Sequence, residues 1–212
     1  MSGRHVVLAL TGASGAAYGL RLGGELLRRG HRVTFLVSRP GFAVLREECG
    51  LDWEGGPHAV AGHLAAHYGA GAGTLHYYAD DDLLAPIASG SRAPDAMVVC
   101  PCSMGSLARI AAGLSGTLIE RCADVALKEG RPLVLVPRET PLSPIHLENM
   151  LRLARLGVRI VPAMPAFYQR PATVDDLVAF MAGKVLDQLG VEHDLFPRWG
   201  AEGENRPGGE QP

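Results

Sequence analysis

The chain has 212 residues, of which 47% are apolar and 20% are charged, and its net charge is −2. This composition is that of a globular domain large enough to bury a core. It excludes the broad basic surface of most nucleic-acid-binding proteins, and the first apolar stretch, 5–10, is too short to span a bilayer. With four cysteines and no visible signal peptide, we expect a reduced, cytoplasmic protein without nucleic-acid or membrane partners.

Apolar runs and helical patterns alternate along the chain. A strand at 5–10, a helix from about Ser14 to Arg29 and a strand at 32–37 form a βαβ unit, and such continuous apolar strands indicate a parallel sheet. The sequence predicts further strands at 96–101, 132–137 and 158–162, and further helices at 40–49, 103–112, 117–129, 143–156 and 173–189. This order predicts an α/β fold, a doubly wound, mostly parallel sheet sandwiched by helices in three Rossmann-like layers.

The remaining segments are less regular. Residues 55–91 show no clear period, and "GAGAG" at 69–73 suggests a flexible loop. We expect a single domain over 1–190 and a C-terminal extension over 191–212. The polar, Gly- and Pro-rich end of that extension, from residue 201, is expected to be disordered.

Polar turns follow three of the predicted strands, and ligands of such sheets bind beyond the carboxyl ends of the strands. After the first strand, the small residues of "TGASGAAYG" would let backbone N–H groups approach an anion, although a tight turn with Ser14 as a helix cap is an equally good interpretation. Ser38, after the second strand, either caps the next helix or contacts a ligand. After the third, a second polar turn is predicted at Ser103, Met104, Gly105 and Ser106.

The fourth strand ends in Arg138 and Glu139. An arginine forks onto phosphates or carboxylates, and a neighbouring carboxylate can move protons. A structural ion pair between the two is the plain alternative. Because this strand end lies on the same rim as the polar turns, a ligand crevice is the interpretation that we favour.

Two further segments carry candidate residues. The loop "PAMPAFYQRP" after the fifth strand holds Phe167 and Tyr168, either as a lid over a planar ligand or packed into the core. Arg121 and Lys128 are seven residues apart on one helix and share a face. They are either solvated charges or cations that reach a neighbouring subunit's site.

Histidines and cysteines are present, but their spacing does not predict a metal site. Cys100 and Cys102 have no second Cys or His pair at zinc spacing. His63 and His67 are four residues apart, yet no third ligand follows a recognisable pattern. We therefore expect no metal.

Taken together, "TGASGAAYGLRL", the run from "CPCSMGSLARIAAG" through "VPRETPLSPIHLENM" to "PAFYQRP", and "TVDDLVAF" resemble the UbiX flavin prenyltransferase family over most of residues 5–190. The resemblance implies a flavodoxin-like fold that binds reduced FMN as a substrate. It implies metal-independent transfer of a dimethylallyl group from dimethylallyl phosphate to the flavin N5 and C6 atoms. It also implies a homo-oligomer, a dodecamer, whose prenylated FMN passes to a UbiD-type decarboxylase.

The resemblance further implies roles for individual residues. The FMN-binding residues would be Gly12, Ala13, Ser14, Ser38, Ser103, Met104, Gly105, Ser106 and Arg138. The catalytic residues would be Ser14, Glu48, Arg121, Lys128, Glu139 and Tyr168, and the donor would be bound by Tyr168, Lys184 and Trp199.

Two other functions are compatible with this fold. An FMN-dependent cysteine-type decarboxylase would carry an Asn in a P-x-M-N motif, where this chain has Pro165. A non-catalytic flavin carrier for a partner decarboxylase would not need the charged set of Arg121, Lys128, Glu139 and Lys184.

Overall fold

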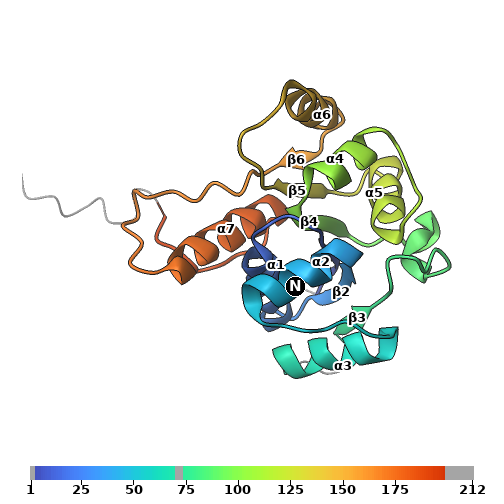
Figure 1. Cartoon of the computed structure of the whole chain (residues 1–212), viewed down its shortest axis with the longest axis horizontal. Coiled ribbons are helices and arrows are strands. Elements are labelled where there is room, and N and C mark those ends of the chain that lie inside the picture. The colour runs from blue at the N-terminus through green and yellow to red at the C-terminus, as the bar shows by residue number, and fades with distance from the viewer. Residues whose placement is uncertain (1–2, 70–73, 199–212) are drawn as a thin grey trace, which may run out of the picture.

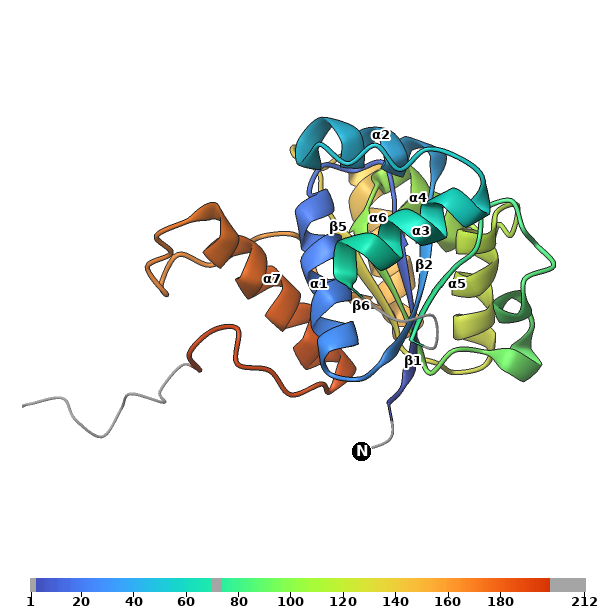
Figure 2. The same ribbon diagram turned by 90° about the horizontal axis from the view of Figure 1, so that it is seen from below.

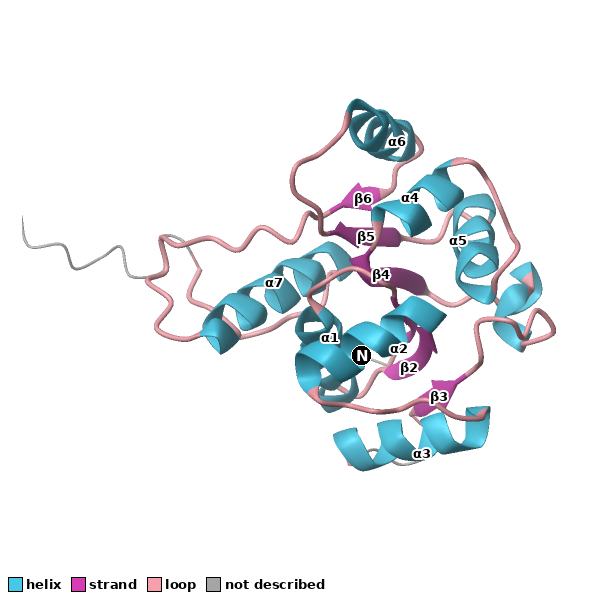
Figure 3. Ribbon diagram, viewed as in Figure 1, coloured by secondary structure: helices cyan, strands magenta, loops and turns pink. Residues whose placement is uncertain are grey.

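The computed structural model, which describes residues 3–69 and 74–198, contains one six-stranded parallel sheet with the strand order β3-β2-β1-β4-β5-β6 (Figures 1 and 3). The strands are β1 (His5–Leu10), β2 (Arg32–Val37), β3 (Leu75–Tyr77), β4 (Ala96–Cys102), β5 (Leu133–Pro137) and β6 (Arg159–Ile160). The helices are α1 (Ala16–Arg28), α2 (Arg39–Cys49), α3 (Pro57–Tyr68), α4 (Met104–Ala111), α5 (Leu118–Lys128), α6 (Pro144–Arg155) and α7 (Val174–Leu189). The predicted α/β fold is therefore confirmed.

Two apolar cores lie on opposite faces of this sheet. Alternate strand residues face opposite ways, so Leu8 and Phe35 pack with helices α1, α3 and α7, whereas Val7 and Leu135 pack with α4, α5 and α6. Figure 2 shows α1 and α7 on one side of the sheet and α5 on the other. Covering helices on both faces explain why the strands read as continuous apolar runs.

The chain reverses its winding direction between β1 and β4, which are neighbours in the sheet. Strands β2 and β3 extend the sheet to one side of β1, and β5 and β6 extend it to the other. At such a switch point the loops after the two central strands diverge and leave a crevice. The loops after β1 and β4 are those that carry the predicted polar turns.

Residues 55–91 contain more regular structure than the sequence indicated. Helix α3 and strand β3 lie there, followed by two single turns of 3-10 helix, Pro86–Ala88 and Gly90–Arg92. Tyr68 anchors α3, since its ring stacks on Phe35 at 5.3 Å and its hydroxyl donates to the Leu20 carbonyl. The predicted flexible loop at 69–73 lies outside the described residues except for Gly69, which ends α3. The predicted disorder from residue 201 also falls outside the described part.

None of the described helices combines the length and apolar character needed to cross a membrane.

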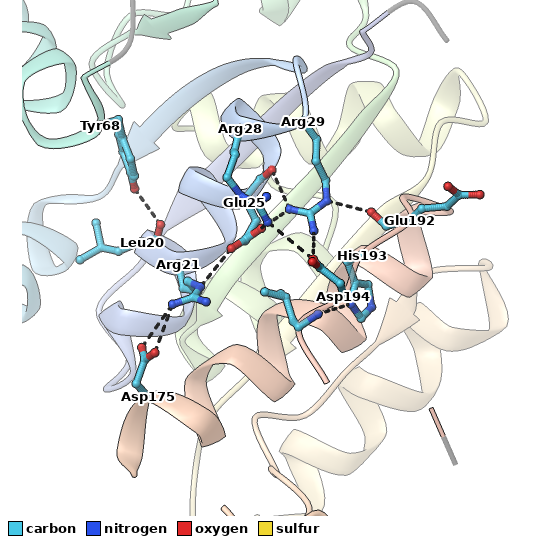
Figure 4. Close-up of polar contacts among 11 residues, drawn as sticks. Leu20, Arg21, Glu25, Arg28, Arg29, Tyr68, Asp175, Glu192, His193 and Asp194 are labelled. Atoms are coloured by element: carbon cyan, nitrogen blue, oxygen red, sulfur yellow. Dashed lines mark hydrogen bonds and ion pairs between the residues drawn. The ribbon is translucent and has the colours of Figure 1, made fainter. Parts of the chain in front are cut away.

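A network of ion pairs joins α1 to the beginning of α7 and to residues 192–194 (Figure 4). At its centre is Glu25, which is buried and pairs with Arg21, Arg28 and Arg29. Arg21 also contacts Asp175 of α7 at 3.2 Å. The network ties the last helix to the first βαβ unit through charges rather than through apolar contacts alone.

We expect Glu25→Gln to lower the free energy of unfolding by about 2 kcal/mol, because three cations then lose a largely buried counter-charge. Burial raises the pKa of Glu25, but hydrogen bonds from Arg28 and Arg29 outweigh it and hold the pKa below its usual value. A depressed folded-state pKa contributes stability above the unfolded-state pKa, and this stability is lost as the pH falls through the folded-state value. Urea unfolding of both proteins should therefore show a gap at pH 7 that narrows below pH 4.5; a gap that is constant with pH would contradict the prediction.

Candidate functional site

The turns after β1, β2 and β4 surround one cavity of about 440 Å³ at the carboxyl edge of the sheet. The predicted residues that line it are Gly12, Ser38, Ser103 and Ser106. Side chains between the strands hold these turns together. The buried Thr11 hydroxyl donates to the Pro101 carbonyl at 2.9 Å and accepts from the backbone N–H of Ser103 at 2.8 Å. The polar turns after β1 and β4 are thus fixed to each other.

The beginning of α4 presents free backbone donors beside this cavity. The Ser103 hydroxyl caps the helix by accepting from the Ser106 N–H at 3.1 Å, and the two hydroxyls are 3.0 Å apart. The N–H groups of Met104 and Gly105 have no acceptor among residues 3–69 and 74–198. A Cβ atom at Gly105 would meet its nearest neighbour only at 4.0 Å, so the approach to these donors is open. Free N–H groups and hydroxyls at a helix start suit a phosphate.

Ser38 has one of the two roles that the sequence left open, that of a helix cap. Its hydroxyl caps α2 by accepting from the Gly41 N–H at 3.1 Å, and the residue lines the cavity. At Gly12, a Cβ atom would lie 2.5 Å from the Pro40 side chain. The absence of a side chain at Gly12 therefore lets the first turn pack against the beginning of α2.

The beginning of α1 is arranged differently, because a carboxylate of the chain itself binds there. Glu48 of α2 accepts from the N–H groups of Gly15 at 2.8 Å and Ala16 at 3.1 Å. Burial raises the pKa of Glu48, but hydrogen bonds from Ser14, Gly15 and Ala16 and the nearby Arg138 lower it by more. The pKa therefore lies below its usual value, and the carboxylate is ionised at neutral pH. Ser14 is not the helix cap, since Gly15 takes that place with φ 109° and no side-chain cap.

Arg138 and Glu139 do not form the structural ion pair that we considered. The Arg138 guanidinium donates through Nε to the Ser14 carbonyl at 3.2 Å, and Glu139 accepts from the Thr140 N–H at 2.9 Å. Arg138 thus extends from the end of β5 to the turn after β1. Glu139 is exposed at the same rim.

Comparisons with known proteins agree with this geometry. The Flavoprotein family model matches residues 1–186. The flavin prenyltransferase UbiX of Pseudomonas aeruginosa is 50% identical over 203 residues, which cover 95% of this chain and 97% of that protein. The flavin prenyltransferase UbiX of Halalkalibacterium halodurans is 52% identical over 198 residues, covering 93% of this chain and 94% of the relative.

The chain belongs to the flavin prenyltransferase UbiX family.

Solved structures of UbiX-like proteins share the fold. The structure of AnUbiX (PadA1) in complex with FMN and dimethylallyl pyrophosphate has a TM-score of 0.82 and 38% identity, and covers 93% of this chain and 97% of that one. A dodecameric FMN-dependent UbiX-like decarboxylase from Escherichia coli O157:H7 has a TM-score of 0.81 and 43% identity, and covers 92% of this chain and 98% of that one. The FMN-dependent cysteine decarboxylase TvaF is only 16% identical, so that likeness concerns the fold alone.

The remaining residues that the UbiX resemblance singled out lie on other parts of this chain. Tyr168 is 55% exposed and its ring contacts that of Phe180 edge-on, while Phe167 is 71% exposed, so the loop does not bury its aromatic rings in the core. Lys184 lies on α7, 3.6 Å from Asp187. Trp199 lies outside the described residues.

Arg121 and Lys128 lie on α5, beside the 3-10 turns before β4. Arg121 donates to the Ala88 carbonyl and pairs with Asp124, and Lys128 pairs with Glu129. Both cations are therefore held by the fold at the surface of α5. Arg138, in contrast, contacts the turn after β1.

Four further residues of the site were not anticipated from the sequence. Thr11 joins the turns after β1 and β4, and its place directly after an apolar strand is the signal that could have identified it. The others line the cavity: Asp80, which accepts from the Ile119 N–H at 2.9 Å, and the ion pair of Arg109 with Glu120. These pairings join residues that are distant in the sequence, so no local sequence pattern predicts them.

The described residues include no group of three His, Cys, Asp or Glu side chains that could hold a metal ion. His67 packs its ring against Trp53 and Tyr68, and Cys100 and Cys102 are buried with free thiols. Burial raises the pKa of Cys102 to about 12. These side chains serve the packing of the chain.

Proposed function

We propose that this chain transfers a dimethylallyl group from dimethylallyl phosphate to reduced FMN, forming bonds at the flavin N5 and C6 atoms and releasing phosphate. The observation that carries this proposal is the cavity bounded by three polar turns, beside which Arg138 crosses from β5 to the turn after β1. About half of the residues are identical to those of named flavin prenyltransferases over almost the whole chain. The structure of a relative with FMN and dimethylallyl pyrophosphate supports a flavin and a phosphorylated dimethylallyl donor as the pair of substrates.

The turns that surround the cavity suit the phosphate group of FMN. The free N–H groups of Met104 and Gly105 and the hydroxyls of Ser38, Ser103 and Ser106 would bind it. The helix start at α1 is not available, because Glu48 already binds there. Arg138 would then hold the flavin on the Ser14 side of the crevice, next to the Glu48 carboxylate.

Cleavage of the allylic C–O bond places negative charge on the departing phosphate and positive charge on the prenyl carbon. Lys184, Arg121 and Lys128 would stabilise the phosphate, and the aromatic face of Tyr168 would stabilise the prenyl cation. Glu139 would hold or move the proton at the flavin edge. The loop that carries Tyr168 would exclude water from the cation.

This reaction would need several copies of the chain. Arg121 and Lys128 are fixed on the surface of α5, so we propose that they act in the site of a neighbouring subunit. A dodecamer, as described for the UbiX-like protein of Escherichia coli, would provide such neighbours. A UbiD-type decarboxylase would receive the product. The cytoplasmic location and the boundary at residue 190 stay predictions.

Mass spectrometry of the flavin gives the direct test. The protein, incubated anaerobically with reduced FMN and dimethylallyl phosphate, should yield a flavin heavier by one C5 unit. A flavin that binds but leaves unmodified would instead support the carrier function. Decarboxylation of a peptide with a C-terminal cysteine would support the cysteine-type decarboxylase.

A further inference from the structure

Lys184, the proposed donor-binding cation on α7, has a competitor for the donor phosphate within its own helix. Its Nζ atom is 3.6 Å from Oδ2 of Asp187, one turn further along. A phosphate anion and this carboxylate would both attract the same ammonium group. The availability of Lys184 to a donor therefore depends on what else neutralises Asp187.

Arg198 is the main partner of Asp187. Its guanidinium donates to both carboxylate oxygens, at 2.7 and 2.9 Å, and the His193 ring lies 3.2 Å from Oδ1. Both contacts come from the same guanidinium nitrogen, Nη1, and both are shorter than the 3.6 Å contact of Asp187 with Lys184, so Arg198 is the stronger partner of the carboxylate. Burial raises the pKa of Asp187, but the contact with Arg198 and the nearby His193 and Lys184 lower it by more. The pKa therefore lies below its usual value, and the carboxylate is ionised at neutral pH. Asp187 is thus neutralised mainly by Arg198 and holds Lys184 only through the longer contact of 3.6 Å.

The segment that carries Arg198 is held in place by other contacts. The centres of the Phe196 and Phe180 rings are 4.9 Å apart. The Phe196 ring also lies directly over Gly183, where an added Cβ atom would come within 2.4 Å of the Phe196 ring. Arg29 donates to the Glu192 carbonyl at 2.8 Å and pairs with Asp194 at 3.1 Å (Figure 4). Loss of the Arg198 guanidinium would therefore leave residues 192–197 docked.

The same segment reaches the loop of the second donor-binding residue. Phe180 lies between Phe196 and Tyr168, and the Gln169 side chain donates to the Pro197 carbonyl at 3.1 Å. The Arg198 guanidinium is also 5.3 Å from the centre of the Phe196 ring. Arg198 thus contacts α7, which carries Lys184, directly through Asp187, and its neighbours Phe196 and Pro197 link it to the loop that carries Tyr168.

We propose that Arg198 is a positioning residue: it neutralises Asp187 and so keeps the Lys184 ammonium available to the phosphate of the prenyl donor. This inference rests on the proposed function. Arg198 itself needs no contact with the substrate. Without Arg198, Asp187 would draw Lys184 into a closer pair and the donor would bind less tightly.

The test measures binding of dimethylallyl phosphate by isothermal titration calorimetry to protein loaded with oxidised FMN, in which no transfer takes place. Arg198→Gln should raise the dissociation constant about fivefold, the scale of one partly exposed ion pair. Arg198→Lys, which keeps the charge, should raise it less. Asp187→Asn combined with Arg198→Gln should restore it to within about twofold of the unaltered protein, since Lys184 then has no competitor.

The control is Asp175→Asn, which removes another Arg–Asp pair from α7 and should change neither donor nor FMN affinity. All variants should bind FMN as the unaltered protein does. Unchanged donor affinity in Arg198→Gln would overturn the inference, as would a double variant no better than Arg198→Gln. If the unaltered protein neither binds the donor nor prenylates FMN, the proposed function fails instead.

Discussion

Glu139→Gln is expected to leave FMN affinity unchanged and to lower turnover about 100-fold, a typical loss for a group that moves a proton. The carboxylate is exposed at the rim of the crevice and, among residues 3–69 and 74–198, accepts only from the Thr140 N–H, so it contributes little to folding. It follows Arg138 directly, which places it beside the proposed flavin site. Anaerobic single-turnover assays, which follow the flavin spectrum and mass, measure the effect.

Two controls separate chemistry from structure in this experiment. Glu148→Gln removes an exposed carboxylate from α6 and should leave turnover unchanged. Glu139→Asp keeps a carboxylate one methylene shorter and should retain part of the activity. Normal turnover in Glu139→Gln would remove Glu139 from the mechanism without affecting the proposed reaction.

Arg138→Ala is expected to weaken FMN binding roughly 10- to 100-fold, the range for loss of a hydrogen bond to a charged group. The Arg138 side chain spans from the end of β5 to the Ser14 carbonyl, so its loss removes both a cation and a link between two turns. Arg138→Lys should recover only part of the affinity, because an ammonium group cannot form the same fork.

The matched control lies at the opposite end of the same strand. Arg131 precedes β5 and is exposed at the amino edge of the sheet, so Arg131→Ala should leave FMN affinity unchanged. Fluorescence titration of FMN gives the dissociation constants. An Arg138→Ala variant that binds FMN within about twofold of the unaltered protein would contradict the FMN role of Arg138.

The sequence was sufficient to predict most of the sheet and its polar rim. Continuous apolar runs marked β1, β2, β4 and β5; small or polar residues marked the ends of the first three, and Arg138 and Glu139 marked the end of β5. Because parallel strands bring their carboxyl ends to one edge, Gly12, Ser38 and Ser103 were expected to come together, and they do. That inference needed only strand direction and order.

Helix α3 could not be predicted, because its pattern is weak. Only Val60 and Leu64 of this helix are buried, and alanines occupy both faces, so no apolar stripe distinguishes it from a loop. Strand β3 has three residues, too few for an alternating pattern.

The Glu48 contact with the beginning of α1 was also beyond the sequence. Glu48 lies 33 positions after Gly15 and 32 positions after Ala16. A glycine-bearing turn alone does not reveal that its backbone N–H groups already donate to a carboxylate of the chain. The arrangement of Lys184, Asp187 and Arg198 likewise depends on how the chain returns over α7. Pairings of this kind are set by tertiary structure, which local propensity does not encode.

The two outermost strands of the sheet, β3 and β6, are only three and two residues long. Each border therefore offers a very short row of backbone groups to which a strand from another molecule could add. The sheet of one copy therefore offers almost no edge to which a strand of a second copy could add, which is the first step toward fibrils. Any contact between copies of this chain would instead have to use the side chains of helices and loops, so its geometry would depend on surface residues that can change without disturbing the sheet.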